Sequence, residues 1–97
     1  MKSRNEIFEI LRKELPYLKK KFHVKTIGLF GSYAREEQAE KSDVDLLVDF
    51  KKPVDFFILI DLEDYLSNKL GVKVEVVTPG GIKERMKPYI MRDVVYV

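Results

Sequence analysis

Hydrophobic residues recur at steps of three and four over residues 5–22, which is the period of a helix that buries one face. Ser3 or Asn5 is positioned to cap the start of this helix. Pro16 lies inside the segment. Because proline lacks an amide hydrogen and crowds the preceding turn, we expect the helix to kink or split there.

A second segment with helical spacing covers residues 56–70, where leucines mark one face and acidic residues the other. Asp55 is the expected N-cap, and Gly71 is the expected stop. The first turns of this segment are apolar nearly all round. We therefore expect either a well-buried helix start or an exposed surface that meets a partner protein.

Three short apolar segments predict strands, at residues 24–30, 43–50 and 72–78. The first contains Gly28, which indicates a close backbone approach or a bulge. Valines alternate with other residues along the third segment, as expected for a strand with two different faces.

The C-terminal part of the chain contains two prolines and two adjacent glycines. We expect a turn at residues 79–81 and a helix from residue 82 to 87. Pro88 is expected to interrupt that helix before residues 89–92. The apolar tail at residues 94–97 predicts either a last strand or a terminus that docks on the core.

The length of 97 residues predicts a single domain spanning residues 1–97. The chain contains no cysteine and no apolar run near the roughly 20 residues that span a bilayer, so we expect a cytoplasmic protein without a membrane partner.

The net charge of +2 conceals an uneven distribution. Residues 1–25 carry eight Lys or Arg and three Glu, whereas residues 36–75 carry eleven Asp or Glu and five Lys. The basic flank is either a solvated face or a surface for a nucleotide, nucleic acid or acidic protein. No aromatic residues interleave the lysine cluster, so nucleic acid is not the main partner that we expect.

The most informative motif is Asp43-Val44-Asp45, at the start of the second expected strand. Asp43 and Asp45 project from the same face of an extended chain, and their charges repel unless a cation lies between them. This strand end is either fully solvated or binds metal. Two Mg²⁺ ions held by such carboxylates suit phosphoryl or nucleotidyl transfer, and Glu75 is the best-placed third carboxylate and proton acceptor.

Gly31-Ser32 follows the first expected strand and is a candidate for the phosphate-binding part of such a site. Glycine lets the backbone approach a phosphate closely, and the serine hydroxyl adds a hydrogen-bond donor. Arg35 is positioned to neutralise charge on a triphosphate or on the departing pyrophosphate.

These motifs, in this order, resemble a known family. The segment FGSYAR at residues 30–35, the ten residues between Ser32 and Asp43, the DVD motif and the later GVKVEVVT are similar to the minimal nucleotidyltransferases of the DNA polymerase β-like superfamily. The resemblance implies an α/β (α+β) fold with a small mixed sheet flanked by helices. It also implies ATP as substrate and two Mg²⁺ ions.

The same resemblance implies a biological partner and a role for each motif residue. Such proteins are commonly encoded beside a HEPN-domain ribonuclease toxin, and they act as its antitoxin by adenylylating a tyrosine. Gly31 and Ser32 match the nucleotide-binding positions, together with Arg35. Asp43, Asp45 and Glu75 match the catalytic and metal-binding carboxylates.

Two residues depart from the family pattern. Aspartate usually stands at the position of Glu75, and glycine usually stands at the position of Glu36. These departures leave open an antitoxin that neutralises its partner by binding alone. Nucleotidyl transfer to RNA or to a small molecule is a third hypothesis.

Overall fold

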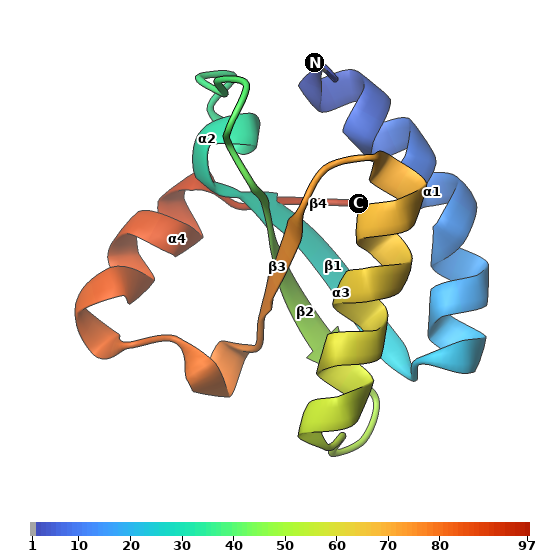
Figure 1. The fold of residues 1–97 in the computed structure, drawn as a ribbon. Coiled ribbons are helices and arrows are strands. Elements are labelled where there is room, and N and C mark those ends of the chain that lie inside the picture. Colours follow the sequence, from blue (N-terminus) through green and yellow to red (C-terminus); the bar gives the residue numbers. More distant parts are fainter. Residues whose placement is uncertain (1) are drawn as a thin grey trace.

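The computed structural model describes residues 2–97 and contains one four-stranded sheet (Figure 1). The elements in chain order are α1 (Arg4–Lys21), β1 (Val24–Phe30), α2 (Gly31–Ala34), β2 (Val44–Phe50), α3 (Phe56–Leu70), β3 (Val74–Val77), η1 (Pro79–Gly81), η2 (Glu84–Met86), α4 (Lys87–Asp93) and β4 (Val95–Tyr96). The predicted fold class, a small mixed sheet flanked by helices, is confirmed.

The strand order in the sheet is β3-β2-β1-β4. β1 pairs with β2 and with β4 in antiparallel fashion, whereas β2 and β3 are parallel. α1 and α3 pack together on one side of the sheet, and α4 lies on the other (Figure 1). The mixed pairing places the starts of β2 and β3 side by side.

The hydrophobic core fills the space between the sheet and the two long helices. Its fully buried members from helices are Ile7, Leu11, Leu18, Leu62, Leu66 and Leu70, and those from strands are Val24, Leu29, Val44, Leu46 and Val48. Alternate residues of β2 therefore face the core, and the residues between them face the opposite side of the sheet.

α1 runs unbroken through Pro16, so the predicted split is wrong. Pro16 is exposed, which lets water solvate the carbonyl that lacks its helical donor. Ser3 caps the helix: its hydroxyl accepts from the Glu6 amide at 3.2 Å, and the Glu6 carboxylate accepts from the Ser3 amide at 3.0 Å.

The predicted bounds of α3 are confirmed. The Asp55 carboxylate accepts from the Ile58 amide at 3.0 Å, and Gly71 ends the helix in the left-handed region with φ +67°. Phe56 and Phe57 are 69% and 74% exposed, so the expectation of a well-buried helix start is wrong for these two rings. The partner surface remains a prediction.

The C-terminal part differs most from the sequence prediction. Pro88 does not interrupt a helix but lies in the first turn of α4, where a missing amide costs no hydrogen bond. The tail forms β4 beside β1. A side chain at Gly28 would collide with Val94 and crowd Tyr96, which confirms the predicted close approach.

Among residues 2–97, no helix combines the length and apolarity that crossing a bilayer requires.

Replacing Gly71 with alanine is expected to lower the free energy of unfolding by roughly 1 kcal/mol, because a Cβ is strained at φ +67°. No atom lies within 4 Å of the added Cβ, so backbone strain is the main cost. Gly80→Ala is the matched control, because that site is equally open and lacks a positive φ. Urea unfolding of both variants measures the difference, and equal stabilities would contradict the prediction.

Candidate functional site

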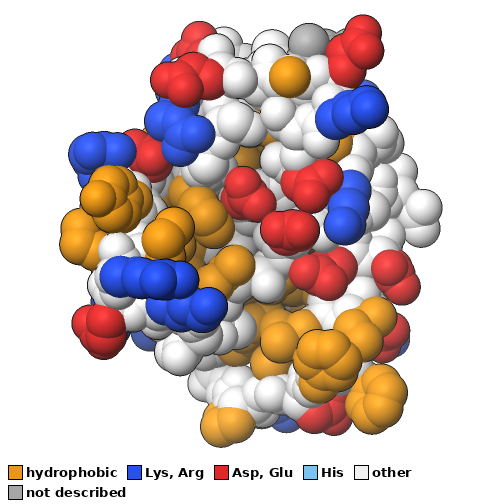
Figure 2. Space-filling view, turned by 60° about the vertical axis from the view of Figure 1, so that its left-hand side comes forward, with side chains coloured by type: hydrophobic (Ala, Val, Ile, Leu, Met, Phe, Trp, Pro, Cys, Tyr) orange, Lys and Arg blue, Asp and Glu red, His pale blue; other side chains and the backbone are white. Residues whose placement is uncertain are grey.

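Three predicted site carboxylates lie near the starts of β2 and β3. Asp45 of β2 pairs in register with Glu75 of β3, and paired residues of parallel strands share a face. Asp43 lies two residues before Asp45, so on an extended chain it projects to the same side. This side is opposite to the core, and acidic side chains gather at the middle of the face shown in Figure 2.

The glycine of the predicted phosphate-binding turn lies directly against Asp45. Gly31 has φ +76°, and a Cβ built on it would collide with the Asp45 carboxylate. The residue before it, Phe30, pairs with Asp45 across β1 and β2. Ser32 follows in α2 and is half-buried. The fold therefore brings the Gly-Ser turn and the Asp-x-Asp strand together.

The electrostatics of the site centre on Asp45. Burial, the charge of Glu75 and the charge of Asp43 raise the pKa of Asp45 to about 6, well above the roughly 3.9 of an ordinary aspartate. Arg35 acts in the opposite direction, as the smallest of the four influences on this pKa. The site thus concentrates negative charge that a cation would stabilise.

Arg35 is close to this centre but is engaged by other carboxylates. Its guanidinium donates to Asp93 at 3.0 Å and to Glu37 at 3.4 Å. The hydrogen bond to Asp93 raises the pKa of Arg35, and the same bond lowers the pKa of Asp93. Asp93 was not predicted from the sequence, because no motif or spacing links it to the Gly-Ser turn.

A hollow of about 230 Å³ separates Asp45 from α4. Its lining combines predicted and unpredicted residues: Phe30, Gly31, Arg35, Asp45, Met86, Tyr89, Ile90 and Asp93. The four C-terminal members were missed because the sequence predicted a helix over residues 82–87 and a break at Pro88, whereas η2 contains Met86 and α4 contains the other three.

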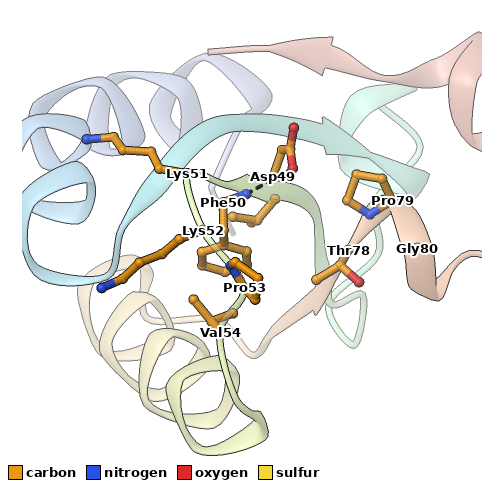
Figure 3. Close-up of a pocket in the computed structure, with 10 residues that line it drawn as sticks. Asp49, Phe50, Lys51, Lys52, Pro53, Val54, Thr78, Pro79 and Gly80 are labelled. Atoms are coloured by element: carbon orange, nitrogen blue, oxygen red, sulfur yellow. Dashed lines mark hydrogen bonds between the residues drawn. The ribbon is translucent and has the colours of Figure 1, made fainter.

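A larger hollow of about 400 Å³ lies at the other end of β2, around Phe50, Pro53 and Thr78 (Figure 3). The side chains of Lys51 and Lys52 point away from it. None of the predicted site residues lines this second hollow.

Glu36, one of the two departures from the family pattern, has an unusual backbone conformation. Its φ of +58° lies in the left-handed region, which favours the glycine that usually stands there. Its carboxylate pairs with Arg4 of α1. The added negative charge is thus matched by a cation from the first turn of the chain's first helix.

A divalent cation fits the chemistry of these carboxylates. Over residues 2–97, no three acidic, histidine or cysteine side chains are gathered closely enough to hold a metal by themselves. Mg²⁺ usually takes only one or two carboxylates and completes its shell with water and substrate phosphates. The raised pKa of Asp45 means that its negative charge is unfavourable in the folded protein, and a bound cation would compensate that charge.

Asp45→Asn is expected to stabilise the metal-free protein at pH 7.5 by roughly 1–2 kcal/mol. A pKa of about 6 corresponds to about 3 kcal/mol of destabilisation when Asp45 is fully ionised, and partial exposure reduces this value. Because the folded-state pKa is raised, the destabilisation grows as pH rises from about 4 through 6.

Chemical unfolding at pH 4 and pH 7.5 in the presence of EDTA tests this expectation. The exposed Asp64 of α3 supplies a matched control, Asp64→Asn, which should change stability little at either pH. A stabilisation by Asp45→Asn that is equal at both pH values would contradict the assignment.

Comparison with known proteins shows the family of this chain. Residues 8–97 match the family model described as the nucleotidyltransferase domain. A protein of Methanocaldococcus jannaschii with a provisional protein adenylyltransferase name is 51% identical over the full length of both chains. The protein adenylyltransferase MntA of Thermococcus cleftensis is 42% identical, over 95% of this chain and 93% of its own.

Solved structures show the same fold. One that is provisionally described as a minimal nucleotidyltransferase superposes with a TM-score of 0.79 at 29% identity, over 97% of this chain and 95% of its own. Two toxin–antitoxin complexes are similar in fold at lower identity. One contains AMP-PNP, with 24% identity, a TM-score of 0.70 and coverage of 96% and 70%. The other joins a tri-AMPylated Shewanella oneidensis HEPN toxin to an MNT antitoxin, with 22% identity, a TM-score of 0.61 and coverage of 96% and 66%.

The resemblance seen in the motifs is thus confirmed by the family match and by the relatives, and the chain belongs to the nucleotidyltransferase domain family.

Proposed function

We propose that this protein is a Mg²⁺-dependent adenylyltransferase that transfers AMP from ATP to a tyrosine of a cognate HEPN toxin encoded nearby, and so acts as its antitoxin. The observation that carries the proposal is the placement of Asp45 between Glu75 and Gly31. The names of the relatives support a protein acceptor. The tri-AMPylated toxin in the structurally similar complex supports the HEPN partner.

Each site residue has a proposed task. The backbone of Gly31 and the hydroxyl of Ser32 bind the β- and γ-phosphates, because they offer hydrogen-bond donors beside the Asp45 carboxylate, where the metal would be held. Arg35 stabilises negative charge on the phosphates. Asp43 and Asp45 hold Mg²⁺, with Glu75 beside them. When bound, the metal supplies Lewis-acid stabilisation of the transferring phosphoryl group.

The reaction balances with the groups present. The acceptor hydroxyl oxygen forms a bond to the α-phosphorus, the bond from that phosphorus to the bridging oxygen breaks, and pyrophosphate leaves. Glu75 accepts the proton of the attacking hydroxyl. Glu75 belongs to β3, the edge strand of the sheet, and it is exposed, so a protein acceptor can reach it from outside.

Incubation with α-labelled ATP, Mg²⁺ and the protein encoded by the neighbouring gene tests the proposal. Label is expected on a tyrosine of the neighbour with wild type, and transfer is expected to fall at least 100-fold with Asp43→Asn/Asp45→Asn, the loss typical of removing key charge-stabilising groups. Asp61→Asn, on the exposed face of α3, serves as the control that retains transfer.

The same experiment separates transfer from simple occlusion. An unlabelled neighbour that both wild type and the double variant still silence by forming a complex would overturn the enzymatic proposal. It would instead support an antitoxin that acts by binding alone.

Mg²⁺ is expected to raise the melting temperature of wild type, because a ligand that binds only the folded state stabilises it, by an amount that grows with the logarithm of ligand concentration above Kd. Asp43→Asn/Asp45→Asn should lose most of this increase. Thermal melts at 0 and 10 mM Mg²⁺, at constant ionic strength, measure the effect. An equal increase in both proteins would mean that the ion acts elsewhere.

A further inference from the structure

We propose that the hollow between Asp45 and α4 is the nucleobase subsite, in which the base stacks on the ring of Tyr89. This inference rests on the proposed function, because it assumes that the phosphates of a nucleotide bind at Gly31 and Ser32. The lining of the hollow includes Gly31 and Asp45 together with four residues that have large apolar or aromatic side chains. These four are Phe30, Met86, Tyr89 and Ile90.

The sheet order determines which flank of Asp45 receives the nucleotide. Glu75, the proposed proton acceptor, lies on the β3 side of Asp45, and Gly31 lies on the β1 side. The acceptor hydroxyl must reach Glu75, so it approaches from the β3 edge. The nucleotide therefore extends from Gly31 toward the opposite flank, where the hollow lies.

Two side chains on this flank expose much of their apolar or aromatic surface. Tyr89 is 57% exposed and Met86 is 45% exposed. Figure 2 shows hydrophobic side chains between the central acidic cluster and the basic side chains at the left of that face. A mixed lining of a few charged groups and a larger apolar surface is typical of a pocket for an organic ligand.

One face of the Tyr89 ring already has a cation beside it. The Arg92 guanidinium lies 5.5 Å from the centre of its ring, and Arg92 does not line the hollow. The cation covers one face of the ring, and in the proposed subsite the base stacks on the other face. Stacking on an aromatic side chain is a general way to bind a base, because every base has a π-face.

The same geometry argues against Tyr89 as an acceptor of AMP. Its ring lies on the nucleotide flank of Asp45, and Glu75 lies on the other flank. A hydroxyl on the nucleotide side could not transfer its proton to Glu75 while a nucleotide filled the space between them. Stacking, and not modification, is therefore the role that we assign to Tyr89.

Equilibrium binding of ATP, UTP and tripolyphosphate in Mg²⁺ tests the assignment without requiring turnover. Tyr89→Ala is expected to weaken ATP binding about tenfold or more, and to leave tripolyphosphate binding unchanged. Tyr89→Phe keeps the ring and should bind ATP within about twofold of wild type. Met91→Ala is the matched control, since Met91 is an exposed residue of α4 that does not line the hollow.

The comparison of bases adds a second readout. Wild type is expected to bind ATP more tightly than UTP, because the larger purine stacks more strongly, and Tyr89→Ala should reduce this preference. Circular dichroism and melting curves of each variant establish that it is folded.

The outcomes separate this inference from the proposed function. Unchanged ATP affinity in Tyr89→Ala, with tripolyphosphate still bound, would overturn the base subsite and leave the phosphate site standing. Equal weakening of ATP and tripolyphosphate would also overturn it, since the loss would then lie in the phosphate site. Failure of wild type to bind either compound would overturn the proposed function as well.

Discussion

The close approach of the Gly31 backbone to the Asp45 carboxylate is the constraint on which the site depends. Only a residue without a Cβ fits there, because a side chain would collide with the carboxylate and the backbone has a positive φ. This close approach and the pairing of Phe30 with Asp45 place the turn after β1 beside the start of β2. Gly31 and Asp45 also both line the hollow, so the same contact forms part of its lining.

One face of the sheet packs on the core, and the opposite face carries the candidate site. Val44, Leu46 and Val48 of β2 pack into the core beneath α1 and α3. The intervening Asp45 faces the other side, beside Glu75 of β3. Because strand side chains alternate, the same seven-residue strand anchors the core and presents the central carboxylate. Register at β2 is therefore critical, since a slip by one residue would bury Asp45 and expose the core.

Local signals in the sequence were enough to predict β1 and α3 to the residue. A glycine after β1, an aspartate cap and a glycine stop at α3 all act within a few residues of the element that they bound. The Asp-x-Asp pair was visible for the same reason. Glu75 was proposed as its partner because it lies on a separate expected strand, and the resemblance then gave it the same role. The strand order and register that place it beside Asp45 depend on contacts that no local motif encodes.

Tertiary placement accounts for what the sequence did not show. Pro88 indicated a break, but a proline is equally at home in a first helical turn, and the choice depends on where α4 packs. Tyr89 and Asp93 reach the hollow only because α4 lies across from β2. The left-handed backbone at Glu36 could not be predicted from the sequence either. The Glu36 carboxylate pairs with Arg4, which lies 32 positions away in the chain.

The unmatched charge at Asp45 has a consequence for laboratory evolution of this protein. A selection for heat resistance, carried out without nucleotide or metal, would reward the loss of a carboxylate that the folded chain accommodates at a cost. The most rewarded substitutions would accumulate at Asp45, the residue to which the proposed function assigns Mg²⁺. Robust variants that keep their activity would have to be sought under saturating ligand, where that charge is balanced.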